Sequence, residues 1–168
     1  MPITPFHFGP GAALHALAPR QVSFLAFCAS NVLIDLESLY NLLTGSHPVH
    51  QFLHTYLGAT LAALVTVVLF RVAQRLAARW RWMPNLFEWR ELALKPLVIG
   101  ALLGAASHVM LDSVMHRDMA PFAPFSAANP LLGIVSLSTL HWFCLGCAVL
   151  ALFIIGVRRR RRSSTSSC

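Results

Sequence analysis

The segment PLVIGALLGAASHVMLDSVM, residues 96–115, decides the fold class of this chain. A helix needs about 20 predominantly apolar residues to cross the hydrocarbon core of a bilayer, and this segment meets that requirement. It nevertheless contains His108 and Asp112. Ionisable side chains inside a bilayer are costly and usually serve a function. The segment therefore predicts a membrane-spanning helix that carries functional polar groups.

Further apolar segments lie along the rest of the chain. Residues 55–73 and 134–157 are long and apolar enough to span a bilayer. Residues 21–43 are also apolar, except that they contain Asp35 and Glu37. We therefore expect an all-α fold, a polytopic helical membrane bundle of about four spans.

The two ends of the chain differ from these spans. Residues 2–19 are apolar but interrupted by Pro and Gly, which favours a re-entrant or interfacial segment over a straight span. Residues 158–168 are basic and Ser-rich. We expect a single helical membrane domain over residues 1–157, followed by this tail.

The composition excludes an ordinary soluble domain. Only 11% of the residues are charged and 57% are hydrophobic, whereas about 25% are charged in soluble domains. Much of the net charge of +7 comes from residues 71–81 and 158–162, which follow apolar runs. Basic residues in such places mark cytoplasmic loops and contact anionic head groups. They predict membrane lipids as partners, a cytoplasmic C-terminus and no binding of nucleic acid.

Six side chains are candidate ligands of a divalent metal ion. These are His7, Asp35, His50, His54, His108 and Asp112. At 1.5 Å per residue, Asp35 lies about 22 Å beyond Arg20, and His108 lies about 20 Å beyond the basic residue that precedes its span. His54 lies about 26 Å from Arg71, on the span that runs the other way. Helices of alternating direction thus place these groups in one layer, near the outer edge of the membrane.

Helical spacing supports part of this set. Residues i and i+4 share one face of a helix. His50 and His54 have this spacing, and so do His108 and Asp112. Imidazoles and carboxylates paired in this way are what a helix offers a divalent metal.

Other polar groups are not clearly placed in this layer. His7 reaches the layer only if the N-terminal segment enters the membrane, and His15 lies too close to the cytoplasmic start of its neighbouring span. Glu37 is two residues from the nearest candidate and is expected to point elsewhere. His116 and Asp118 are expected in a solvated loop beyond the span, with His116 as an additional ligand.

The order of these motifs resembles that of the YdjM-like inner-membrane proteins, which are described as membrane-bound metal-dependent hydrolases. The features that match, over roughly residues 6–126, are His7 in FHFGPG, Asp35-Leu-Glu37, His50-Gln-Phe-Leu-His54-Thr55, His108-Val-Met-Leu-Asp112 and Pro124-Phe125. The chain departs from the family at three positions. Ile34 stands where the family usually has Pro, Glu37 replaces an Asp, and Gln51 replaces an Arg.

The resemblance implies a multi-pass protein of the bacterial inner membrane. The family is distantly similar to zinc-dependent phospholipase C and P1 nuclease, which implies a phosphoester or lipid-linked substrate, met at the extracytoplasmic face. It assigns no catalytic residue in this chain.

The residue types agree with metal-dependent hydrolysis. Imidazoles and carboxylates suit zinc, the divalent metal that we expect as cofactor. Such an ion lowers the pKa of bound water to about 7 and polarises an ester or phosphoryl oxygen. Two alternatives stay open: a non-catalytic membrane protein that binds metal ions or protons, and a structural or regulatory bundle. The cytoplasmic halves of the spans carry no polar residues that would continue a path for ions, which argues against a conduit.

Overall fold

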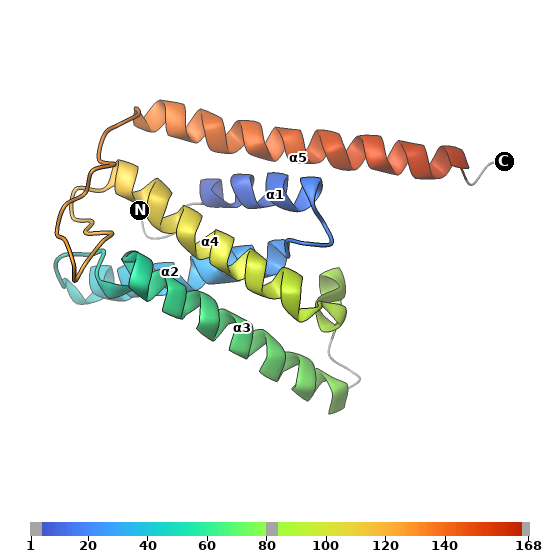
Figure 1. Ribbon diagram of the computed structural model, residues 1–168, viewed down its shortest axis with the longest axis horizontal. Coiled ribbons are helices and arrows are strands. Elements are labelled where there is room, and N and C mark those ends of the chain that lie inside the picture. Colours follow the sequence, from blue (N-terminus) through green and yellow to red (C-terminus); the bar gives the residue numbers. More distant parts are fainter. Residues whose placement is uncertain (1–4, 80–83, 166–168) are drawn as a thin grey trace.

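The computed structural model describes residues 5–79 and 84–165, and all of its regular structure in these ranges is helical. Figure 1 shows the five α-helices, which are α1 (Phe8–Leu17), α2 (Phe24–Thr44), α3 (Tyr56–Arg79), α4 (Leu94–Met115) and α5 (Leu137–Thr165). Three short 3-10 turns join them, namely η1 (Pro5–His7), η2 (Phe52–His54) and η3 (Leu86–Glu91). The predicted all-α fold class is confirmed.

Local sequence signals explain where α2 begins and ends. The Ser23 hydroxyl accepts a hydrogen bond from the backbone N–H of Ala26 at 3.3 Å and so caps the first turn. The helix stops at Gly45, whose φ of 68° lies in the left-handed region that glycine adopts without steric cost. These two signals set the length of the helix that carries Asn31, Asp35 and Glu37.

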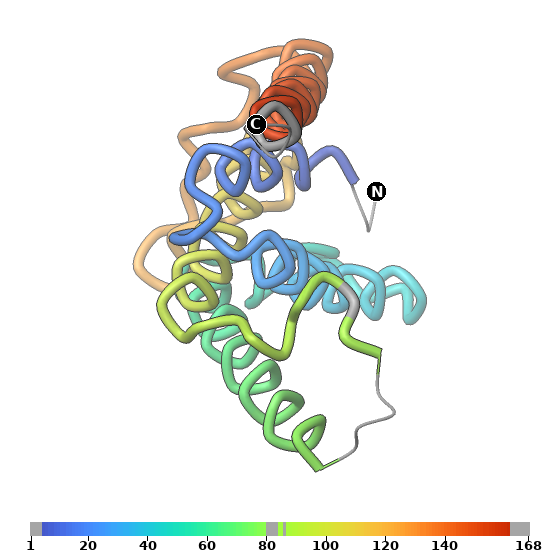
Figure 2. The backbone as a smooth tube through the Cα atoms, turned by 90° about the vertical axis from the view of Figure 1, so that its right-hand side faces the viewer, coloured from blue at the N-terminus to red at the C-terminus, as the bar shows by residue number. Residues whose placement is uncertain are grey.

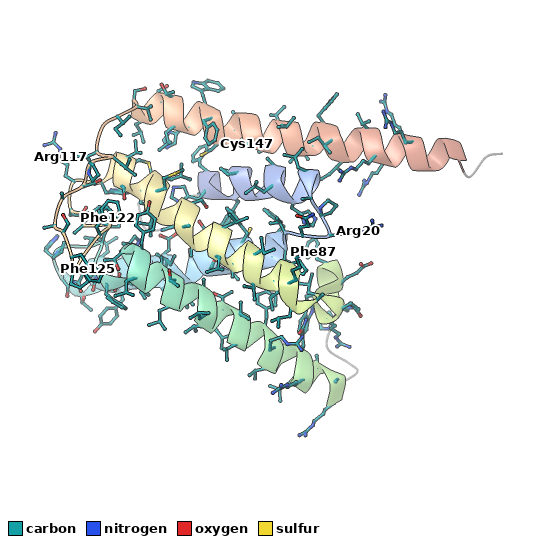
Figure 3. The ribbon with its side chains drawn as sticks, in the orientation of Figure 1. Arg20, Phe87, Arg117, Phe122, Phe125 and Cys147 are labelled. Carbon is teal, nitrogen blue, oxygen red and sulfur yellow. The ribbon has the colours of Figure 1, made fainter. Side chains whose placement is uncertain are left out.

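Helices α2 to α5 alternate in direction, so the connections gather at two ends of the bundle (Figure 1). The loops at residues 45–55 and 116–136 form what we call the loop end. The opposite end, which we call the basic end, holds the α1–α2 turn, η3 and the last turns of α5. Figure 3 places Arg20 at the basic end and Arg117 at the loop end.

Helix α1 lies alongside α5 in both backbone views (Figures 1 and 2). Gly9 allows this close approach, because a Cβ at that position would collide with the backbone carbonyl of Cys144. At the other end of α1, the guanidinium of Arg158 donates to the carbonyls of Ala16 and Leu17. The last carbonyls of a helix lack partners within it, so this contact completes the C-terminus of α1.

Helix α4 packs closely against both α2 and α3. A Cβ at Gly100 would meet the backbone of Ser23, and one at Gly104 would meet the carbonyl of Phe27. Small residues at this spacing allow helices to approach closely in membranes, where the hydrophobic effect does not drive their association. The close contact between α2 and α4 brings Asp35 next to His108 and Asp112.

Three helices of the described residues are long and apolar enough to cross a membrane, by length and composition. They are α3, α4 and the part of α5 up to Arg161. Helix α2 has 21 residues but is not among the three, because Asn31, Asp35 and Glu37 make it less apolar. The fourth span therefore stays a prediction.

Helix α1 has 10 residues, about 15 Å of helix, which is half of a span. Its placement as a re-entrant or interfacial segment also stays a prediction. Helix α5 continues past residue 157 through the arginine run to Thr165, so part of the basic tail is helical.

Candidate metal centre

Four of the predicted ligands converge near the loop end. Asp35, His54, His108 and Asp112 each offer one ligand atom, and these atoms all lie within 4.8 Å of one another. We call these residues the inner cluster. All four are buried, His108 completely and His54 almost completely. They come from α2, η2 and α4, so the site depends on packing between three separate elements.

The ligand atoms of the inner cluster lie farther apart than hydrogen-bonded atoms usually do. His108 Nε2 lies 3.4 Å from Asp35 Oδ1 and 3.3 Å from Asp112 Oδ2. His54 Nε2 lies 4.0 Å and 3.8 Å from the same two oxygens. N–H···O hydrogen bonds are usually about 2.9 Å long. Ligands bonded at about 2.0–2.1 Å to a tetrahedral zinc ion stand about 3.3–3.4 Å apart. The two His108 distances match that separation, and the two His54 distances exceed it by about 0.4–0.7 Å.

His7 adds a further imidazole to the inner cluster. Its Nε2 lies 3.3 Å from Asp112 Oδ1, the carboxylate oxygen that the other histidines do not face. Its Nδ1 lies 3.3 Å from His108 Nδ1. Within the described residues, His7 Nε2, His108 Nε2 and Asp112 Oδ1 are buried and have no hydrogen-bond partner. Buried polar groups are almost always satisfied, so three neighbouring exceptions need an explanation.

Neighbouring side chains determine which nitrogen of His108 faces the carboxylates. The Asn31 amide donates to the carbonyl of Phe27 at 2.8 Å, which leaves its Oδ1 to accept from His108 Nδ1 at 3.0 Å. A neutral His108 then carries its lone pair on Nε2, toward two carboxylates. Groups that only accept hydrogen bonds repel one another unless a cation lies among them.

Glu37 holds His54 in the same way. Its Oε2 accepts from the backbone N–H of Leu53 at 2.9 Å and lies 3.3 Å from His54 Nδ1. Glu37 lies outside the inner cluster, as expected, but η2 folds back over α2 so that its carboxylate contacts the ring nitrogen of His54 that does not face the site. Ligand histidines usually donate their second nitrogen to a carboxylate or carbonyl, and the partners of His108 and His54 follow that pattern.

The predicted helical pairing of His50 with His54 is also wrong. Gln51 between them has φ −111° and ψ −129°, outside the helical region, and the two histidines lie on a loop and η2. Their rings still meet edge to face, with centroids 4.8 Å apart. The loop therefore brings the two histidine rings together, as a helix face was expected to do.

His50 belongs to a second group, with His116 and Asp118, whose ligand atoms also lie within 4.8 Å of one another. We call this the outer cluster. Asp118 accepts from His50 Nδ1 at 2.9 Å and from the backbone N–H of Val49 at 3.1 Å. The rings of His50 and His116 stack, with centroids 4.2 Å apart.

Electrostatics in the outer cluster favour the forms that bind metals. Burial lowers the pKa of His116, more than the nearby Asp112 carboxylate raises it. Burial alone would raise the pKa of Asp118, but its hydrogen bond with His50 brings that pKa below the usual value. A neutral imidazole and an ionised carboxylate are the forms that bind a metal. The sequence predicts Asp118 in a solvated loop and not as a ligand. Its position two residues after His116 is the only local pattern that points to a role beside that histidine.

The remaining histidines lie outside both clusters. His15 Nδ1 donates to the carbonyl of Val22 at 2.7 Å, and the ring of His141 stacks on Phe6 with centroids 4.6 Å apart. His47 is exposed in the α2–α3 loop. None of them belongs to either cluster.

The fold and the site define a helical membrane protein with a buried His/Asp cluster that can hold a metal ion. The family model described as YdjM inner membrane protein matches residues 6–166, and the chain belongs to this family. The match includes α5, whereas the motifs in the sequence reached only to residue 126. No curated protein and no solved structure matches the chain.

Proposed function

We propose that this protein is a membrane-embedded, metal-dependent hydrolase. The observation that carries the proposal is the set of buried polar atoms without hydrogen-bond partners, His7 Nε2, His108 Nε2 and Asp112 Oδ1, within the described residues. These atoms lie among acceptors at distances that suit ligands of one ion better than hydrogen bonds.

The residues fit a divalent ion, and zinc suits them best. Asp35, His54, His108 and Asp112 would hold it, and His7 would contact the second oxygen of Asp112. Imidazole and carboxylate ligands are typical of catalytic zinc. When bound, such an ion polarises an ester or phosphoryl oxygen and makes water a nucleophile at neutral pH.

The chain itself supplies orientation and a dry environment. Asn31 and Glu37 fix the nitrogens that His108 and His54 present to the site. In phosphoester hydrolysis, a water oxygen attacks phosphorus, the bond to the leaving oxygen breaks, and that oxygen takes up a proton. We assign the acid and base of this reaction to no residue.

The position of the site suits a substrate from the membrane. With the basic end in the cytoplasm, as positive charge favours, α2 acts as the fourth span and α1 as a re-entrant half-helix. The loop end then lies at the extracytoplasmic face of the inner membrane, and the C-terminus is cytoplasmic. A phosphoester or lipid-linked substrate can reach this level from the head-group layer.

A second candidate follows from the same geometry. A proton on His108 Nε2 would also satisfy Asp35 and Asp112, and the cluster would then be an ion-paired structural centre or a proton-binding site. This version needs no metal and no substrate.

Metal analysis of the purified protein separates the two candidates. We expect bound zinc in the wild type and in His47→Ala, a loop variant outside both clusters, and loss of the inner-cluster ion in Asp112→Asn and in His108→Ala. Hydrolysis of vesicle phospholipids and of a soluble aryl phosphodiester should be lost in the same two variants. Equal metal content in all four proteins would overturn the proposal.

A further inference from the structure

The outer cluster is independent of the four residues that hold the proposed inner ion. His50 lies in the α2–α3 loop, and His116 and Asp118 lie just beyond the end of α4. Loops so far apart in the sequence come together through Asp118, which accepts from the backbone of Val49 and of His50 as well as from the His50 ring. The cluster is therefore built by tertiary contacts and is more than a pair of neighbours in sequence.

The donor set of the outer cluster is that of a metal site. Two imidazoles and one carboxylate offer ligand atoms within 4.8 Å of one another. Asp118 engages only Nδ1 of His50. Within the described residues, His50 Nε2 and both ring nitrogens of His116 make no hydrogen bond. Nitrogen atoms thus remain for a ligand.

The exposure of the outer cluster differs from that of the inner one. His50 is buried, whereas the Asp118 side chain is 36% exposed. A cation held by three protein groups at such a place keeps open positions for water or substrate. Three protein ligands and an open position are the arrangement of many catalytic zinc sites.

A cavity begins at the outer cluster. Its volume is about 390 Å³, and His50 and Asp118 form part of its wall together with apolar residues that include Phe52, Leu57 and Pro124. Ligand sites have volumes of about 300–1,000 Å³, with mostly apolar walls and a few polar groups. With a cation held at His50 and Asp118, an anionic group joined to an apolar group would contact both the cation and the apolar wall.

The two clusters are adjacent. The His50 ring contacts the His54 ring of the inner cluster edge to face, with centroids 4.8 Å apart. Two ions about 3.5–4 Å apart can bind the attacking and the leaving oxygen of a phosphoester together, and the contact of these rings places the two clusters side by side.

We propose that His50, His116 and Asp118 bind a second divalent cation, which faces the cavity and makes the centre a two-ion site for a phosphoester with an apolar substituent. This inference rests on the proposed function, to which it adds a second ion, a substrate class and three residues.

Titration of metal-free protein with Zn²⁺ or Mn²⁺, followed by metal analysis, tests the inference. The variants are His116→Ala and Asp118→Asn for the outer cluster and Asp112→Asn for the inner cluster. The controls are His47→Ala, from the same loop as His50, and Glu88→Gln, an exposed acid at the basic end. Size-exclusion profiles in detergent check that each variant is folded.

We expect two ions in the wild type and in both controls, and one in His116→Ala and in Asp118→Asn. In these two variants the remaining ion should bind with nearly unchanged affinity. A single ion in the wild type that disappears in Asp112→Asn would overturn the second site and leave the proposed function intact. Two ions retained in both outer variants would also overturn it. Full metal content in Asp112→Asn would instead contradict the inner site.

Discussion

The inner and outer clusters use the same side-chain types in opposite surroundings. The inner cluster sits on α2, η2 and α4, is buried, and has its histidines held by Asn31 and Glu37. The outer cluster sits on two loops, and its carboxylate is partly exposed. Burial strengthens electrostatic attraction to an ion and slows its exchange, whereas exposure leaves room for a substrate. The inner cluster is therefore suited to hold an ion tightly, and the outer cluster is suited to admit a substrate.

The same Asp→Asn change in each cluster tests most directly whether the two clusters bind metal independently. In Asp112→Asn we expect metal affinity of the inner cluster to fall by more than the roughly 10–100-fold that loss of a ligand's hydrogen-bond partner costs, since a ligand itself is lost. Activity should fall to background. In Asp118→Asn the inner cluster should keep its affinity, as competition with a chelator would measure. Equal losses at the inner cluster would show that the two clusters act as one.

Removal of metal is expected to have the next largest effect. An ion that binds only the folded protein stabilises it by about 2.7–4.1 kcal/mol when present at 100–1,000 times its Kd. For a chain of this size, about 2–4 °C of Tm accompany each kcal/mol. We expect a chelator to lower the Tm by about 5–15 °C in the wild type and in Asp118→Asn, measured by thermal unfolding in detergent. The Tm of Asp112→Asn should respond less than that of the wild type; a response equal to that of the wild type would contradict a buried inner ion.

Glu37→Gln tests how much the inner cluster depends on orientation. The amide keeps an acceptor for the N–H of Leu53 but loses the charge beside His54. We expect metal affinity to fall about 10–100-fold with the fold preserved. Glu88→Gln removes a charge of the same kind at the exposed η3 and should change nothing. Metal titration of the two variants would measure the difference, and identical curves would remove the orienting role.

Gly9→Ala tests how α1 presents His7 to the inner cluster. The added methyl would collide with the Cys144 carbonyl, so α1 must move away from α5. Overpacking of this kind costs about 1–3 kcal/mol. We expect a lower Tm and a drop in metal affinity of about tenfold, as 1.4 kcal/mol of lost binding would give. Gly146→Ala on α5 meets open space and serves as the matched control. Equal metal affinity in Gly9→Ala and Gly146→Ala would mean that the packing of α1 against α5 does not affect the site.

His15→Ala is expected to have the smallest effect. This variant loses one hydrogen bond to the Val22 carbonyl, worth about 1 kcal/mol, and leaves both clusters complete. Metal content should equal that of the wild type while the Tm falls slightly. Loss of metal in this variant would mean that the α1–α2 turn contributes to the site.

The sequence predicted the helical part of the centre well. His108 and Asp112 lie four residues apart on a long apolar helix, so their level and face followed from helix geometry alone. Asp35 followed from the same counting on α2. The fold class was predictable for the same reason, because long apolar segments have few alternatives to helix in a membrane.

The loop part of the centre was not predictable in this way. His54 reaches the site from η2 and not from a helix face. Its contact with Glu37 depends on how the loop folds back over α2. Asp118 was missed because its role depends on hydrogen bonds across 68 and 69 residues of sequence. Backbone conformation in loops is set by such distant contacts, which local spacing does not encode. In α2, the polar residues that build the site also lower the apolarity from which a span is predicted.

The contact of α1 with α5 has a consequence for biosynthesis. Helix α1 is synthesised before α5, its main partner. His7 precedes α1 directly, and Arg158, which completes the other end of α1, lies in α5. During synthesis, α1 and the adjacent His7 can therefore take up their final position only after α5 has been made.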